Sequence, residues 1–193
     1  MSRLLAHALG FAPLVVLGLR WAGDALPINL NRYLMLRSGT IGLVLLLAAL
    51  ACTPLSLLGW RGASQLRRPI GLYAFAYMLA HLFVYALAEN ELDPFLIARD
   101  LGERWSMSVG LAALLLLVPL AATSTRGWQR RLGARWKALH RLIYLAAPLA
   151  ALHYYALDRD IKTTPLIYAA VLAGLLALRL PPVRRQLARA RRR

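Results

Sequence analysis

Six long apolar segments limit what this chain can fold into. They cover residues 5–22, 40–58, 70–88, 106–123, 137–156 and 164–180. An α-helix needs about 20 predominantly apolar residues to cross the hydrocarbon core of a bilayer. Hydrophobic residues make up 60% of the 193-residue chain and charged residues 17%, a balance typical of membrane proteins. We therefore predict an all-α integral membrane protein, a bundle of six transmembrane helices.

The segments between the apolar runs are short. The sequence therefore predicts a single transmembrane domain over residues 1–193, with no soluble appendage and with a basic tail at residues 181–193. The first apolar run lacks a small-residue cleavage site and continues through Arg20 and Trp21. We expect it to be a retained helix and not a signal peptide.

The basic residues are unevenly distributed between the two sides of the predicted bundle. On an alternating topology, most of the 24 Lys and Arg residues lie on one side, which carries no acidic residue. All eight acidic residues lie on the other side. Because a Lys and Arg excess marks the cytoplasmic side, both termini are predicted to be cytoplasmic. The net charge of +16 is then explained by anchoring next to anionic lipid, with the basic tail as a partner site as the alternative, and no nucleic-acid partner is predicted.

The sequence contains no motif for hydrolysis or for a built-in nucleotide domain. Cys52 is the single cysteine and lies inside an apolar run, so there is no disulfide framework and no Cys-x-x-Cys-His for covalent heme attachment. Walker A, GxGxxG and His-Glu-x-x-His patterns are also absent from the sequence. The histidines are the remaining candidates for chemistry.

Two of the four histidines are predicted to lie at the same depth in the membrane. His81 follows Arg68, at the cytoplasmic start of its segment, by thirteen residues, and His153 follows His140 by the same number. Thirteen residues of α-helix rise about 20 Å. Level histidines on parallel helices can supply both axial ligands of a heme iron, so we predict that His81 and His153 bind heme. The alternative is that each is a packing histidine bonded to a carbonyl or a serine.

Zinc is disfavoured because these two segments contain no Cys, Asp or Glu that could complete a tetrahedral site. His7, near the cytoplasmic end of the first run, is predicted to be an interfacial side chain and not a ligand.

Three interpretations of His140 stay open. It is a ligand in a second heme site, or it lies beside a flavin or quinone headgroup, or it is only interfacial. No histidine lies at its level on segment 70–88. On an ideal helix His140 and His153 point about 140° apart, although Pro148 between them can bend the helix. Arginine suits phosphate recognition, and the candidates near this level are Arg67, Arg68, Arg135 and Arg141.

Three stretches give the chain a resemblance to a known family. They are RRPIGLYAFAYMLAHLFVY, TSTRGWQRRLGARWKALHRLIYLAAPLAALHYYAL and PLIYAAVLAGLLALR. Through them the chain resembles the MsrQ family, the heme-binding membrane subunits of bacterial periplasmic methionine sulfoxide reductase systems. The resemblance covers nearly the whole chain. More distantly, the chain resembles the transmembrane domain of ferric reductases and NADPH oxidases.

The resemblance implies a b-type cytochrome of the bacterial inner membrane with a ferric reductase-like transmembrane domain. Its electrons would come from the quinone pool or a cytosolic flavin reductase and pass to a periplasmic molybdopterin-containing methionine sulfoxide reductase. The family implies that His81, His140 and His153 are associated with heme, and that FMN is a further cofactor. The wider superfamily has two histidines on each of two helices, whereas segment 70–88 has one, so a second heme is left open.

Other classes of function make different predictions. A ferric or cupric reductase-type carrier would use the same histidines with another acceptor. A histidine-lined cation or proton transporter usually places acidic residues at midmembrane, and here every acid lies outside the predicted spans. An assembly factor would bind no chromophore. We expect an electron-transfer subunit that is not an enzyme on its own, with residues 88–105 as an outer loop that docks the partner or is merely solvated.

Overall fold

The computed structural model describes residues 2–60, 62–157 and 162–183 of the chain. Residues 184–193 of the predicted basic tail lie outside this part. All secondary-structure elements of the described residues are helical, which confirms the all-α prediction. The chain divides into two compact units, Met1–Asp93 and Pro94–Arg193. We call them unit 1 and unit 2.

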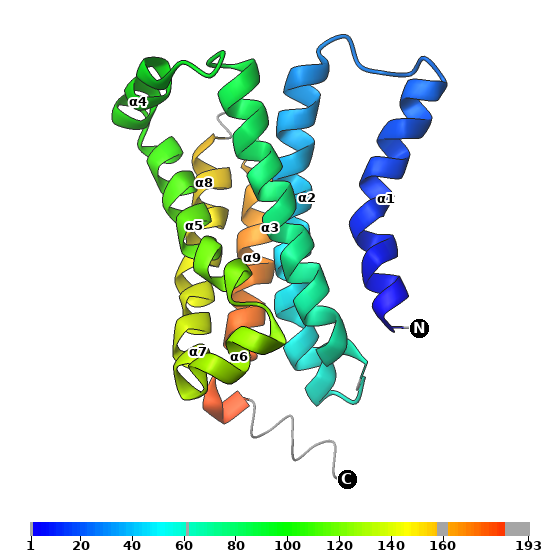
Figure 1. Ribbon diagram of the computed structural model, residues 1–193, viewed down its shortest axis with the longest axis vertical. Coiled ribbons are helices and arrows are strands. Elements are labelled where there is room, and N and C mark those ends of the chain that lie inside the picture. The colour runs from blue at the N-terminus through cyan, green and yellow to red at the C-terminus, as the bar shows by residue number, and fades with distance from the viewer. Residues whose placement is uncertain (1, 61, 158–161, 184–193) are drawn as a thin grey trace. The chain divides into compact units, whose positions relative to one another are not determined.

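Unit 1 contains α1 (Ser2–Ala22), α2 (Leu30–Leu57) and α3 (Ala63–Ala88). The helix α2 begins after Asn29, whose side chain accepts a hydrogen bond from the Arg32 backbone N–H at 2.9 Å, an N-cap. Helices α2 and α3 lie side by side (Figure 1). Their contact buries apolar side chains of both helices, among them Leu46, Leu50 and Ile70. This helix pair holds His81.

The first helix packs on α3 through two polar contacts. His7 Nδ1 lies 2.8 Å from the Tyr73 hydroxyl oxygen, and the Tyr77 hydroxyl donates to the Gly10 carbonyl at 2.8 Å. A Cβ at Gly10 would come within 2.5 Å of the Tyr73 ring, so glycine is what allows this close approach. His7 is exposed and joins α1 to α3 through its contact with Tyr73. Its place at the membrane interface stays a prediction.

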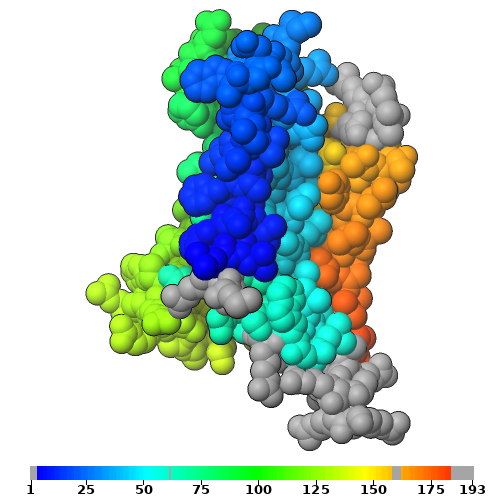
Figure 2. All heavy atoms as spheres, turned by 90° about the vertical axis from the view of Figure 1, so that its right-hand side faces the viewer, coloured from blue at the N-terminus to red at the C-terminus, as the bar shows by residue number. Residues whose placement is uncertain are grey.

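The outer surface of α1 is apolar and exposed. Leu4, Leu19 and Trp21 expose more than two thirds of their surface, and Figure 2 shows α1 running in dark blue along this face of unit 1. Such a surface is compatible with lipid tails, which are as apolar as leucine.

Unit 2 contains α4 (Pro94–Glu103), α5 (Trp105–Ala122), α6 (Arg126–Leu132), α7 (Ala134–Leu139), the 3₁₀ turn η1 (His140–Leu142), α8 (Ile143–Leu157) and α9 (Thr163–Ala177). Helix α8 packs against both α5 and α9. Ala113, Ala146 and Ala147 are buried in this unit, and small residues let helix backbones approach closely. The α5–α8 pair holds His153.

Four helices of the described part are long and apolar enough to cross a membrane: Leu4–Ala22, Leu30–Leu57, Ala63–Ala88 and Trp105–Ala122. The last two predicted segments form shorter helices, α8 and α9, of 15 residues each. The protein is thus a helical membrane protein, whereas the count of six spans and the cytoplasmic placement of both termini stay predictions. Segment 137–156 is not one helix, because η1 interrupts it at His140.

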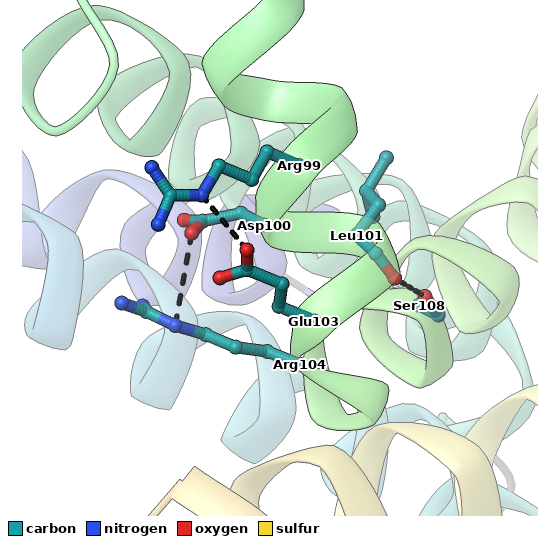
Figure 3. A network of polar contacts seen from close by, with 6 residues as sticks. All are labelled: Arg99, Asp100, Leu101, Glu103, Arg104 and Ser108. Atoms are coloured by element: carbon teal, nitrogen blue, oxygen red, sulfur yellow. Dashed lines mark hydrogen bonds and ion pairs between the residues drawn. The ribbon is translucent and has the colours of Figure 1, made fainter.

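The segment 88–105 contains a helix, α4, that the sequence pattern did not predict. Pro94 opens it, and proline is well suited to a first helical position. Arg99 pairs with Glu103 at 2.8 Å and Arg104 with Asp100 at 3.7 Å, both at i,i+4 spacing (Figure 3). The Ser108 hydroxyl donates to the Leu101 carbonyl at 2.6 Å. These contacts fix the junction at which α5 begins.

Candidate functional site

His81 is held by the backbone of the neighbouring helix in unit 1. Its Nδ1 lies 2.8 Å from the Met35 carbonyl oxygen on α2. A carbonyl oxygen only accepts hydrogen bonds, so Nδ1 carries the proton and the lone pair of the neutral ring is on Nε2. Gly39 lies one turn after Met35, and a Cβ there would be 3.0 Å from Nδ1 of His81. The half-buried ring therefore occupies space that glycine leaves on α2.

His153 is held in the same way in unit 2. Its Nδ1 donates to the Ser106 carbonyl oxygen on α5 at 2.7 Å, which again places the lone pair on Nε2. Gly110 follows Ser106 by one turn, and a Cβ there would be 2.6 Å from Nδ1 and Cε1 of His153. The His153 ring thus lies closer to the backbone of α5 than the His81 ring lies to the backbone of α2.

This donor chemistry fits a heme. Histidines that bind metal usually donate their second ring N–H to a carbonyl or carboxylate, which fixes the tautomer and the orientation of the ring. The alternative interpretation, a packing histidine, also predicts a hydrogen bond from each ring to a carbonyl. The same hydrogen bond is the one that a histidine ligand needs. Among residues 2–60, 62–157 and 162–183, no group of three or more His, Cys, Asp and Glu could hold a metal ion by itself. A porphyrin supplies its own ring nitrogens, and the axial ligands come from the protein.

His140, the first residue of η1, lies in a different environment, beside Thr123 at the C-terminal end of α5. Its ring stacks on Trp136 with centroids 3.9 Å apart, and its Nε2 lies 3.2 Å from the Thr123 hydroxyl oxygen. That hydroxyl donates its proton to the Pro119 carbonyl at 2.6 Å, so it accepts from Nε2–H of His140. The Trp136 indole N–H donates to the Thr123 carbonyl at 3.0 Å. His140 thus has the opposite tautomer from His81 and His153.

The four predicted arginines divide between the units. Arg67 and Arg68 lie in the first turns of α3 in unit 1, whereas Arg135 in α7 and Arg141 in η1 flank His140 along the chain in unit 2. All four side chains are exposed. Within unit 2 the basic residues and the Trp136–His140 stack therefore belong to one short segment.

Sequence reasoning found the histidines but missed the groups that hold them. A backbone carbonyl leaves no mark in a sequence, so nothing singled out Met35 or Ser106. His81 follows its carbonyl partner by 46 residues and His153 follows its partner by 47. This near-equal spacing becomes visible only once the structure identifies the two carbonyls.

The chain is similar to known proteins of one family. The model of the ferric reductase like transmembrane component matches residues 38–151, more than half of the chain. The protein-methionine-sulfoxide reductase heme-binding subunit MsrQ of Rhodospirillum rubrum is 46% identical over 96% of this chain and 91% of its own length. The MsrQ proteins of Ralstonia nicotianae and Caulobacter vibrioides are 43% and 40% identical, each over 88% of this chain and over 78% and 81% of their own lengths. No solved structure matches the chain.

The chain therefore belongs to the MsrQ family within the ferric reductase-like transmembrane class, which confirms the resemblance seen in the sequence.

Proposed function

We propose that the protein is a b-type cytochrome that carries electrons across the bacterial inner membrane, with His81 and His153 as axial ligands of one heme iron. The observation that carries the proposal is the matched bonding of the two rings, each with Nδ1 on a carbonyl at 2.8 or 2.7 Å. Relatives that span nearly the whole chain are named heme-binding subunits. A bound heme b supplies a one-electron redox centre whose potential depends on its ligands and surroundings.

The residues of the chain have limited tasks in this proposal. Nε2 of His81 and of His153 would hold the heme iron through its lone pair, and the hydrogen bond at Nδ1 would raise the basicity of each imidazole. The apolar helices keep water from the macrocycle. Electron transfer needs no general acid or base, so the protein acts as a subunit of an oxidoreductase and not as an enzyme on its own.

The direction of transfer follows from the predicted topology. His81 and His153 are expected in the outer half of the membrane, so they serve the exit of electrons. The acceptor is a protein-methionine-sulfoxide reductase, in line with the names of the relatives. We propose further that this acceptor is periplasmic and contains a molybdenum cofactor. The donor is the quinone pool or a cytosolic flavin reductase, because the chain has no nucleotide-binding motif of its own.

The proposal is tested by one spectrum of the purified protein. Reduction with dithionite is expected to sharpen the visible bands of a low-spin b-type heme, with at least one heme per polypeptide. A ferric or cupric reductase-type carrier would show the same bands and would differ in its acceptor. A colourless protein would contradict the proposal and favour a transporter or an assembly factor.

The entry side of the proposal involves His140 and the basic residues around it. FMN or a quinone headgroup is proposed to bind there, with Arg135 and Arg141 near its phosphate or carbonyl. The stack of His140 on Trp136 at 3.9 Å supports this placement, because a flat aromatic surface suits an isoalloxazine or quinone ring. Arg67 and Arg68 are proposed to contribute from the start of α3.

We predict that His140→Ala keeps the low-spin heme but loses flavin, or is reduced more slowly by reduced quinone. The Arg135→Ala/Arg141→Ala double variant should share the defect, whereas Arg130→Ala in α6 serves as a matched control for loss of positive charge. The measurements are flavin content per polypeptide and the rate of heme reduction. If both values equal those of the wild type in His140→Ala, the inner site does not involve this residue.

A further inference from the structure

We propose that Gly39 and Gly110 are positioning residues for the two histidine ligands, and that each works with the backbone carbonyl one turn before it. The inference rests on the proposed function, because positioning has a purpose only if His81 and His153 bind the heme. It goes beyond the ligand assignment by naming the features of α2 and α5 that set how the two rings are turned.

In unit 2 the atoms nearest to a Cβ built at Gly110 all belong to His153. They are Cε1 and Nδ1 at 2.6 Å and Cγ at 2.9 Å. These are Nδ1 and the two atoms bonded to it, so the Nδ1 edge of the ring faces α5. The Ser106 carbonyl receives the Nδ1 proton from the same side, at 2.7 Å. Nε2 is consequently turned away from α5, the helix that supports the ring.

Unit 1 repeats this arrangement with a slightly looser fit. The nearest atoms to a Cβ at Gly39 are Nδ1 at 3.0 Å, Cε1 at 3.1 Å and Cγ at 3.5 Å of His81. The Met35 carbonyl receives the Nδ1 proton. The same edge therefore faces α2, and Nε2 is turned away from that helix.

The carbonyl and the glycine on each supporting helix have complementary roles in orienting the histidine. The carbonyl fixes the tautomer and the glycine lets the ring approach close enough to reach that carbonyl. Because a carbonyl oxygen has two lone pairs, it can accept the imidazole as well as the N–H of its own helix. Orientation by such outer groups typically changes metal affinity by about 10- to 100-fold when it is lost.

The distances predict a graded effect of adding one methyl group. In Gly110→Ala the new Cβ would lie 2.6 Å from ring atoms of His153, so the ring or the helix backbone must shift. Either shift disturbs the hydrogen bond from Nδ1 to the Ser106 carbonyl. We expect heme retention about 10- to 100-fold weaker, with conversion of the remaining heme toward high spin. In Gly39→Ala a shift of a few tenths of an ångström relieves a contact at 3.0 Å, so we expect heme to be retained with a shifted midpoint potential.

Three glycines serve as matched controls. Gly42→Ala brings a Cβ within 2.8 Å of Met78 Cγ, so it disturbs the contact of α2 with α3 without touching a histidine. Gly71→Ala meets only the Ala49 Cβ at 3.9 Å, and Gly174→Ala meets nothing within 4 Å. The readouts are heme loss to an excess of apomyoglobin, the low-spin electron paramagnetic resonance signal and the midpoint potential.

The expected order of effects is Gly110→Ala, then Gly39→Ala, with Gly71→Ala and Gly174→Ala equal to the wild type. A Gly110→Ala protein with the retention, spin state and potential of the wild type would overturn the inference. Equal effects of Gly42→Ala and Gly39→Ala would overturn it for unit 1, because packing alone would then explain the change. If Gly110→Ala does not fold, the comparison of Gly39→Ala with Gly42→Ala and Gly71→Ala decides.

A wild-type protein that binds heme, with glycine variants that do not differ from it, leaves the cytochrome proposal intact. A wild-type protein without heme overturns both.

Discussion

His81→Ala and His153→Ala are each expected to abolish the low-spin heme spectrum of the protein. Each substitution removes one of the two proposed axial ligands and leaves the iron with a single imidazole, so the heme is either lost or becomes high spin. The measurement is the absorption and electron paramagnetic resonance spectrum of each purified variant, together with heme per polypeptide. If both variants kept the full low-spin spectrum, the assignment of His81 and His153 as the ligand pair would be wrong.

Two controls separate loss of a ligand from loss of the fold. His7→Ala is expected to keep the heme, because His7 bonds to Tyr73 on α3 and has no part in the proposed ligand pair. His153→Gly is expected to regain a low-spin spectrum when imidazole is added, since the free base can take the place of the missing ring. A variant that has merely unfolded would not respond to imidazole.

Removal of heme is expected to lower the stability of the protein substantially. The proposed ligands come from different units, His81 from unit 1 and His153 from unit 2, so one heme would link them. A ligand that binds only the folded state stabilises that state by about 4 kcal/mol when its free concentration is about 1,000 times its Kd. The apoprotein should therefore unfold at a lower temperature than the heme-loaded protein in the same detergent.

The same effect should be visible in limited proteolysis. The segment between α3 and α4 joins the two units, and it contains exposed residues such as Glu91 and Leu92. We expect faster cleavage there in the apoprotein, and no protection when heme is added to His81→Ala. Identical melting temperatures and cleavage rates with and without heme would contradict a heme that links the units.

The apolar pattern predicted the helical class because hydropathy is what a bilayer selects, but it misplaced helix ends. Segment 40–58 begins later than α2, which starts at Leu30, because Arg32 and Arg37 lower the local hydropathy. The structure keeps these residues in a helix, with Asn29 as its cap and with Arg37 over the Tyr33 ring at 5.4 Å. Helix α4 was missed because its charges resemble a loop, although their i,i+4 pairing supports a helix.

The prediction for residues 137–156 assumed one regular helix. The 3₁₀ turn at His140–Leu142 winds differently from an α-helix, so the angle of about 140° estimated between His140 and His153 for an ideal helix does not apply. The break belongs to η1 and not to Pro148, which lies inside α8.

The candidate site was partly predictable for a physical reason. Histidine in an apolar segment is rare enough to be noticed, and its depth follows from the rise per residue. The Met35 and Ser106 carbonyls and the two glycines lie on other helices, and their role depends on which helices pack together. Tautomers also depend on that packing, so the contrast of His140 with His81 and His153 needed coordinates. The equal depth of His81 and His153 stays a prediction.

The most direct test of the central claim is an experimental structure of the heme-loaded protein in a membrane mimetic. We predict that Nε2 of His81 and Nε2 of His153 bind one heme iron from opposite faces of the porphyrin. The Nδ1 atoms are expected to stay hydrogen-bonded to the Met35 and Ser106 carbonyls. A heme bound by any other pair of side chains, or two histidine rings with only lipid or protein between them, would contradict the account.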